Sequence, residues 1–149
     1  MTDRLKIALA QLNPIVGDID GNADRIRAAR DTAKDADLIV FSELVLSGYP
    51  PEDLVLKPFF QDKIEAAVKV LASETSDGGP ALLIGTPWRE NGALMNAALL
   101  LDGGEIVAAR YKRDLPNYGV FDEKRVFSAG PMPGPINFRD VRIGAPVCE

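Results

Sequence analysis

Residues 37–43 read DLIVFSE, and this stretch decides how the rest of the chain is interpreted. Its four consecutive apolar residues form a run of strand length, which is typical of a strand covered on both faces of its sheet. The run stops just before a carboxylate, Glu43. Since active sites of open α/β sheets gather beyond the carboxyl ends of strands, Glu43 becomes a candidate site residue.

The segments on either side alternate between strands and helices. Residues 5–12 (LKIALAQL) alternate as a strand, and residues 23–36 place apolar side chains on one helical face after Asn22, the expected N-cap. Residues 59–75 show a second helical stripe, and residues 81–86 (ALLIGT) a second buried strand. This order predicts an α/β fold, a layered sheet that is parallel in part.

The second half of the chain is interpreted as two hairpins joined by a long loop. Residues 94–112 contain two apolar runs around a DGG turn at 102–104, and residues 136–147 form a second hairpin that runs into Cys148. Residues 113–135 between them are rich in turn residues and have no clear period. Loops of this length inside a compact domain are usually functional or disordered.

Composition restricts the class of protein. The chain has 149 residues, 46% apolar and 26% charged, which suits one globular domain. Its net charge of -5 argues against a nucleic-acid partner, because phosphate binding needs a basic face. No apolar run approaches the roughly 20 residues of a membrane span, and the first residues show no secretory signal. With a single cysteine and no internal disulfide, we expect a cytoplasmic protein without a membrane partner.

The sequence contains no histidine. Cys-His and Ser-His catalysis are therefore excluded for side chains of this chain, as is any metal site with histidine ligands. If Cys148 is an activated nucleophile, its base must be a carboxylate or a lysine.

Three reactive side chains follow apolar strand-like runs. Glu43, Lys112 and Cys148 each come directly after such a run, so they converge at one edge if their strands share a sheet and a direction. A carboxylate can take the proton of a thiol, and a lysine can stabilise both the thiolate and an oxyanion. Taken singly, each has an ordinary explanation: a small buried cysteine, a loop carboxylate and a solvated lysine. The residues alone leave a cysteine hydrolase as one possibility.

Three longer segments resemble the catalytic segments of the nitrilase (carbon-nitrogen hydrolase) superfamily, and in the same order. They are residues 37–54 (DLIVFSELVLSGYPPEDL), 111–127 (YKRDLPNYGVFDEKRVF) and 143–149 (IGAPVCE). The finer features resemble the glutaminase domains of glutamine-dependent NAD synthetases. The resemblance implies a layered α-β-β-α sandwich, here incomplete, with residues 1–149 as the N-terminal part of the hydrolase domain.

The resemblance also assigns roles by position. Glu43 matches the general base of the family, Lys112 its catalytic lysine and Cys148 its nucleophile. Further positions match residues of the glutamine pocket or its surroundings: Tyr49, Tyr118, Phe121, Glu123 and Glu149. Aromatic rings suit the methylenes of glutamine, and carboxylates suit its ammonium group.

The implied reaction is hydrolysis of the glutamine side-chain amide, with no cofactor and no metal for that step. Ammonia would then pass to a separate domain that uses ATP and Mg to amidate deamido-NAD, in a protein that commonly forms homo-oligomers. Two alternatives stay open. One is a freestanding amidase of the same superfamily acting on another small amide, and the other is a non-catalytic fragment that keeps the scaffold.

Overall fold

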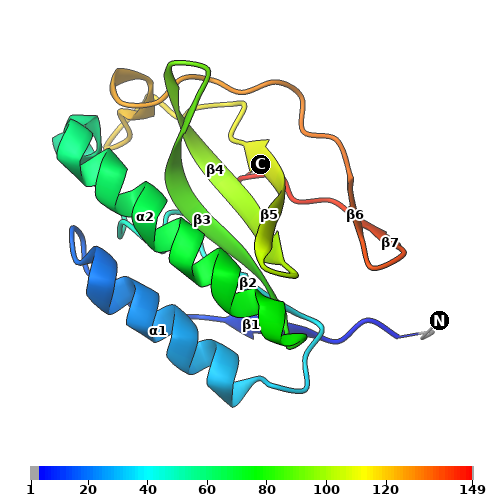
Figure 1. The fold of residues 1–149 in the computed structure, drawn as a ribbon. Coiled ribbons are helices and arrows are strands. Elements are labelled where there is room, and N and C mark those ends of the chain that lie inside the picture. Colours follow the sequence, from blue (N-terminus) through cyan, green and yellow to red (C-terminus); the bar gives the residue numbers. More distant parts are fainter. Residues whose placement is uncertain (1–3, 149) are drawn as a thin grey trace.

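A computed structural model describes residues 4–148. Its main sheet has five strands in the order β1-β2-β3-β4-β5 (Figure 1). The strands are β1 (Ile7–Ala10), β2 (Leu38–Phe41), β3 (Ala81–Glu90), β4 (Ala93–Asp102) and β5 (Glu105–Tyr111). β1, β2 and β3 are parallel to one another, and β4 is antiparallel to both of its neighbours. β5 therefore runs in the same direction as β2, and the predicted α/β sheet, parallel in part, is confirmed.

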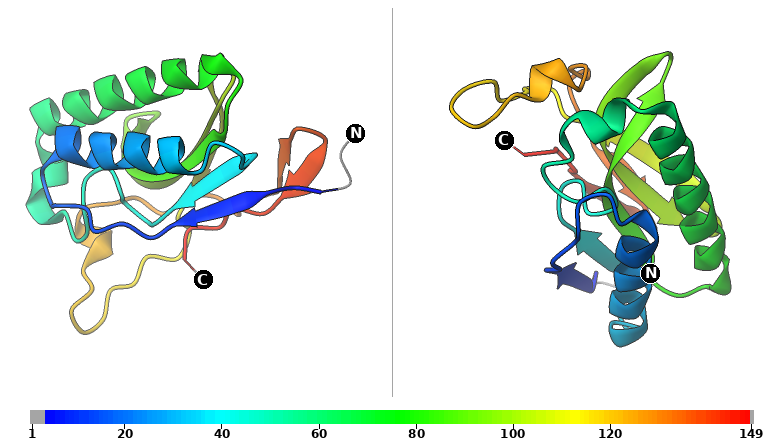
Figure 2. Two further views of the ribbon diagram at one scale, coloured as in Figure 1. Left: turned by 90° about the horizontal axis from the view of Figure 1, so that it is seen from below. Right: turned by 90° about the vertical axis from the view of Figure 1, so that its left-hand side faces the viewer.

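Two helices, α1 (Ile19–Thr32) and α2 (Pro58–Glu74), cover one face of this sheet (Figure 2, left). Their buried stripes, with Ile26 on α1 and Leu71 on α2, pack on strand residues such as Ile39 to form the larger apolar core. In the described part of the chain, no helix is both long and apolar enough to cross a membrane.

The opposite face is covered in part by a hairpin of β6 (Ile136–Phe138) and β7 (Val141–Ile143), which form a separate two-stranded sheet. Phe138 of this hairpin packs with Leu38 and Leu100 of the main sheet in a second, smaller core. Figure 2 (left) places the helices on one side of the sheet and the C-terminal segment on the other. The edge strand β1 leaves Leu9 80% exposed on the face turned away from the helices.

The start of α1 differs from the expectation. The N-cap is Asp18, whose side chain accepts a hydrogen bond from the Gly21 N–H, and Asn22 lies inside the helix. Asn22 is fully buried, and its amide donates to the carbonyl oxygens of Ile15 and Leu46 at 2.8 and 3.0 Å. The prediction of Asn22 as the cap was therefore wrong, because its side chain bonds to backbone groups of two loop segments and not to the N–H groups at the helix end.

Short 3₁₀ helices interrupt the predicted loops, and β3 continues beyond its predicted end. The 3₁₀ helices are η1 (Glu52–Leu56), η2 (Thr75–Asp77) and η3 (Glu123–Arg125). β3 extends through Pro87 to Glu90, and this extension pairs with the first residues of β4. The longer β3–β4 ladder matters for the site, since it carries Asn96 opposite Pro87.

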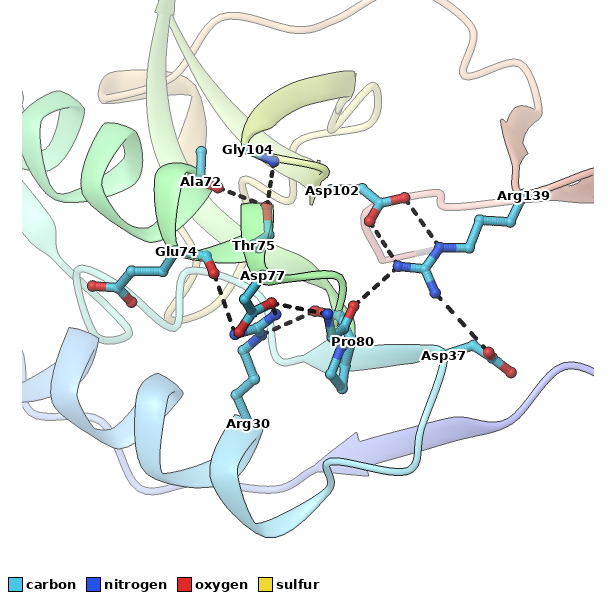
Figure 3. A network of polar contacts seen from close by, with 11 residues as sticks. Arg30, Asp37, Ala72, Glu74, Thr75, Asp77, Pro80, Asp102, Gly104 and Arg139 are labelled. Carbon is cyan, nitrogen blue, oxygen red and sulfur yellow. Dashed lines mark hydrogen bonds and ion pairs between the residues drawn. The ribbon is translucent and has the colours of Figure 1, made fainter.

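An ion-pair network fastens the β6–β7 hairpin to the main sheet (Figure 3). Arg139, in the hairpin turn, donates to both carboxylate oxygens of Asp102 at 2.8 and 3.2 Å and to the Gly79 carbonyl oxygen at 3.1 Å. The hydrogen bonds to Asp102 raise the pKa of Arg139 despite its partial burial. Because the chain runs from this hairpin to Cys148, the network helps to fix where the thiol lies.

Candidate active site

Glu43 lies just past the carboxyl end of β2, where the chain crosses very close to β3. A Cβ atom on Gly85 of β3 would lie 2.4 Å from the Leu44 nitrogen and 2.8 Å from the Glu43 Cα. Only glycine leaves room for this crossing, which is why the apolar strand ALLIGT contains one. Gly85 thereby allows the base candidate to sit at the edge of the sheet.

Lys112 directly follows β5, and its backbone is held on both sides. Its N–H donates to the Asn96 carbonyl oxygen at 2.8 Å, and its own carbonyl oxygen accepts from the Gly130 N–H at 2.9 Å. A Cβ atom on Gly130 would lie 2.6 Å from the Cβ of Tyr111. The long loop therefore returns to the end of β5 through a position that only glycine can occupy.

The side chains of Glu43, Lys112 and Glu123 form one ionic cluster. Lys112 is 2% exposed, and its Nζ donates to Glu43 Oε1 at 2.7 Å and to Glu123 Oε1 at 2.8 Å. Burial alone would lower the pKa of Lys112, but the hydrogen bonds to Glu123 and Glu43 outweigh it and raise that pKa. The ammonium form therefore persists inside the site at neutral pH.

Cys148 is exposed and lines a cavity of about 710 Å³ together with Glu43 and Lys112. Glu43 and Lys112 follow parallel strands of one sheet, as expected. Cys148 does not, because the last strand before it, β7, belongs to the separate hairpin and ends at Ile143. The expected convergence at one sheet edge therefore holds for two of the three residues, and the third arrives from the second layer.

The aromatic residues predicted for the pocket line the same cavity as the cysteine. They are Tyr49, Tyr118 and Phe121. The rings of Tyr118 and Phe121 meet edge to face with centroids 5.6 Å apart. Partial burial, followed by the nearby carboxylates Glu123 and Glu43, raises the pKa of Tyr49. Its hydroxyl therefore stays neutral and able to donate a hydrogen bond.

Glu123 and Glu149 are the two carboxylates that the family resemblance predicts in or around the pocket. Glu123 is buried and bonded to Lys112 through Oε1, and it also reaches the cavity wall. Glu149 lies outside the described residues. In residues 4–148, no group of three or more His, Cys, Asp or Glu side chains is arranged to hold a metal ion.

Asn96 is a site residue that the sequence reasoning missed. It lies in β4, it is fully buried, and its Nδ2 donates to Glu43 Oε1 at 2.7 Å. The available signal was a lone amide inside the apolar stretch ALMNAALLL, residues 93–101. A polar side chain in a buried strand needs a partner, and here the partner is the base candidate.

A second, smaller cavity of about 340 Å³ adjoins the first and shares Tyr49, Phe121 and Glu123 with it. The loops around both cavities are joined by Arg125, which bonds to Asp122 of its own loop and to Glu52 and Asp53 of the loop after β2. The two loops that carry the aromatic residues are therefore tied to each other at the surface.

The fold and this Glu-Lys-Cys cavity agree with a comparison against known families. The model of the carbon-nitrogen hydrolase family matches residues 6–149. The chain therefore belongs to the carbon-nitrogen hydrolase family, and the resemblance noted in its sequence segments is confirmed.

Comparison with individual proteins gives a closer resemblance than the family match. The glutamine-dependent NAD(+) synthetase of Rhodobacter capsulatus is 44% identical over 151 residues, which cover all of this chain and 27% of the relative. The glutamine-dependent NAD+ synthetase of Acinetobacter baumannii, solved with ADP, superimposes with a TM-score of 0.87 at 35% identity, over 94% of this chain and 27% of that one. The chain thus spans about a quarter of the length of these relatives.

A second similar structure is an amidase variant from Nesterenkonia sp. AN1, with a TM-score of 0.81 at 28% identity, covering 94% of this chain and 54% of that one. That structure shows covalent addition of the acetamide moiety of fluoroacetamide at its active site cysteine. The nitrilase-like fold expected from the sequence is confirmed by these neighbours.

Proposed function

We propose that this chain carries a glutaminase site in which Cys148 is the nucleophile, Glu43 the general base and Lys112 the cation that holds the oxyanion. One observation carries the proposal: a buried ammonium bonded to two carboxylates shares a cavity with the chain's only cysteine. The similarity to glutamine-dependent NAD synthetases over the whole chain supports glutamine as the substrate.

In the first half of the reaction, Glu43 takes the proton of the Cys148 thiol. The sulfur attacks the side-chain amide carbon of glutamine, a C–S bond forms, and the carbonyl electrons move to oxygen. Lys112 and a backbone N–H near the nucleophile stabilise this oxyanion. The C–N bond then breaks, Glu43 returns its proton to the nitrogen, and ammonia leaves a thioester behind.

In the second half, water replaces the amine. Glu43 takes a proton from water as the oxygen attacks the thioester carbon. The C–S bond breaks, the sulfur recovers its proton from Glu43, and glutamate is released. Glu43 thus carries one proton at a time in both halves, and no cofactor enters either of them.

The cavity walls suit a glutamine side chain. The rings of Tyr49, Tyr118 and Phe121 offer apolar surface to its methylenes, and the cavity of about 710 Å³ leaves ample room for it. For Glu123 we propose a role in holding Lys112, since its Oε1 is already bonded to the ammonium. Glu149 remains a proposed contact for the substrate amino group.

For the whole protein we propose the activity of its relatives. Ammonia would be consumed by ATP- and Mg-dependent amidation of deamido-NAD to NAD, in a homo-oligomer in the cytoplasm. The chain itself corresponds to 27% of such a relative, so this part of the proposal rests on similarity alone.

The test compares two nitrogen sources in the full-length protein. Cys148→Ala should abolish NAD formation from glutamine and leave NAD formation from free ammonia intact. Loss of both activities would contradict the proposal, because it would make Cys148 a structural residue. An electrophilic diazoketone analogue of glutamine should label wild type and not Cys148→Ser, and a folded wild type that stays unlabelled would favour the non-catalytic alternative.

A second candidate function is an amidase acting on another small amide, which the similarity to the Nesterenkonia enzyme favours. Initial rates with glutamine and with acetamide or propionamide distinguish the two. A kcat/KM for either simple amide above that for glutamine would replace the glutaminase proposal with this one.

A further inference from the structure

Asn96 contacts two residues of the proposed site, Glu43 and Lys112. Its side chain donates to Glu43 Oε1 at 2.7 Å, and its backbone carbonyl oxygen accepts from the Lys112 N–H at 2.8 Å. Asn96 is fully buried within the β3–β4 ladder. Both contacts are therefore made from a strand, whose backbone is held by its neighbours, and not from a loop. The strand thereby fixes the distance between the base and the lysine.

Glu43 Oε1 accepts two hydrogen bonds, one from Asn96 Nδ2 and one from Lys112 Nζ, each at 2.7 Å. An amide N–H and an ammonium can only donate, and one carboxylate oxygen has two lone pairs. The opposite orientation of the Asn96 amide would bring two acceptors together, so the chemistry supports the observed one. Both lone pairs of Oε1 are therefore occupied, and any proton on Glu43 must bind Oε2.

We propose that Asn96 is a positioning residue that restricts Glu43 to a single proton-carrying oxygen, Oε2, during glutamine hydrolysis. This inference rests on the function proposed above. With Asn96 in place, the carboxylate cannot exchange its two oxygens, because Oε1 is held by two donors. Asn96 carries no charge and does not titrate. The charged or titratable groups that line the cavity with Glu43 are Tyr49, Lys112, Asp114, Tyr118, Glu123, Lys124 and Cys148.

Stability does not account for the amide. Among the described residues no group donates to Asn96 Oδ1, although that atom is buried. An unsatisfied buried acceptor is destabilising, and the apolar strand gains nothing from the amide oxygen. The amide is explained by the hydrogen bond that its N–H donates to Glu43 Oε1.

The test is the pH dependence of glutamine hydrolysis by the full-length protein with Asn96→Leu and with Asn96→Asp. Loss of one hydrogen bond to a carboxylate should move the acid limb of kcat/KM to higher pH by about one to two units. At pH 7 we expect kcat/KM to fall at least about tenfold, with KM changing less than kcat. Thr86→Val is the matched control, because Thr86 is a buried polar residue of the neighbouring strand whose hydroxyl donates to Pro87 and not to Glu43.

An unchanged acid limb in a folded Asn96 variant would overturn the inference, as would unfolding of both variants, which would make the residue structural. Failure of the glutaminase proposal itself is distinguishable. In that case wild type hydrolyses no glutamine. The pH dependence of Cys148 alkylation by iodoacetamide, a reaction that needs no substrate, is then compared between wild type and the Asn96 variants for the same shift.

Discussion

Lys112 is a buried ammonium that forms ion pairs with two carboxylates from different parts of the chain. Glu43 comes from the end of β2 and Glu123 from η3, and both bond to the same Nζ at 2.7 and 2.8 Å. Removing one partner of a buried ionic cluster leaves uncompensated charge, which typically costs more than the cluster itself contributes. The stability of the site therefore depends on this one residue more than on either carboxylate.

Lys112→Met should lower the free energy of unfolding by about 3–5 kcal/mol at neutral pH. Met cannot donate to Glu43 or Glu123, so both carboxylates lose a hydrogen bond in the variant. Denaturant titrations of wild type and the variant at pH 7 measure this difference. Lys6→Met, which removes an exposed ion pair to Asp35, is the control and should change stability by less than about 1 kcal/mol. A loss for Lys112→Met as small as that of the control would contradict the ionic cluster.

The raised pKa of Lys112 has its own consequence for wild type. The ammonium should titrate above the ordinary value of 10.5, because its two carboxylate partners outweigh burial. Its contribution to stability should thus be complete below about pH 10.5 and be lost as pH rises through the raised pKa. Nuclear magnetic resonance of the labelled Lys112 side chain measures this titration directly. A midpoint below 10.5 would show that burial outweighs the two carboxylate partners.

At the scale of elements, the strands position the site through their ends and through one glycine. β2 and β5 bring Glu43 and Lys112 to the same edge, and Gly85 of β3 lets the Glu43 segment cross. The site is therefore built from strand ends that the sequence pattern could identify and from a close backbone crossing that it could not.

Gly85→Ala should displace Glu43, since the new methyl would lie 2.4 to 2.8 Å from backbone atoms of residues 42–44. We expect a destabilisation of about 1–3 kcal/mol and a fall in glutamine kcat/KM of at least about tenfold. Gly134→Ala is the matched control, because a methyl there meets open space. Equal activities of the two variants would show that the crossing does not position the base.

How far the sequence predicts this molecule depends on the range of each interaction. β2, α2 and the β4–β5 hairpin follow from local apolar periodicity, and the three sequence segments gave the family and Glu43, Lys112 and Cys148. Asn22 was misassigned because its partners, Ile15 and Leu46, come from two loops that only the fold brings together. Asn96 was missed for the same reason: its partner lies 53 residues away.

At the scale of the whole molecule, the site joins two layers that are built separately. Glu43 and Lys112 belong to the main sheet, whereas Cys148 follows the β6–β7 hairpin on the opposite side from the helices. The small core of Leu38, Leu100 and Phe138 and the Arg139 network hold the hairpin in place. The distance from the Cys148 thiol to the Glu43 carboxylate therefore depends on how the two layers dock.

Arg139→Ala should loosen that docking. Because the Arg139–Asp102 pair is partly exposed, we expect a loss of only about 0.5–1 kcal/mol in global stability. Amide hydrogen exchange over residues 136–143 should nevertheless speed up, and glutamine kcat/KM should fall by up to about tenfold. Lys63→Met, which removes an exposed ion pair between the helices, should change neither. Unaltered exchange in the hairpin of Arg139→Ala would assign the docking to the apolar contacts alone.

Arg125 links the two loops that surround the cavity, and its three acidic partners are all more than half exposed. Attraction between such solvent-facing charges weakens as dissolved ions accumulate around them. We therefore expect the tie between these two loops to weaken as the ionic strength of the medium rises. Lys112 and its two carboxylate partners are much less exposed, so their hydrogen bonds should respond far less to the same dissolved ions.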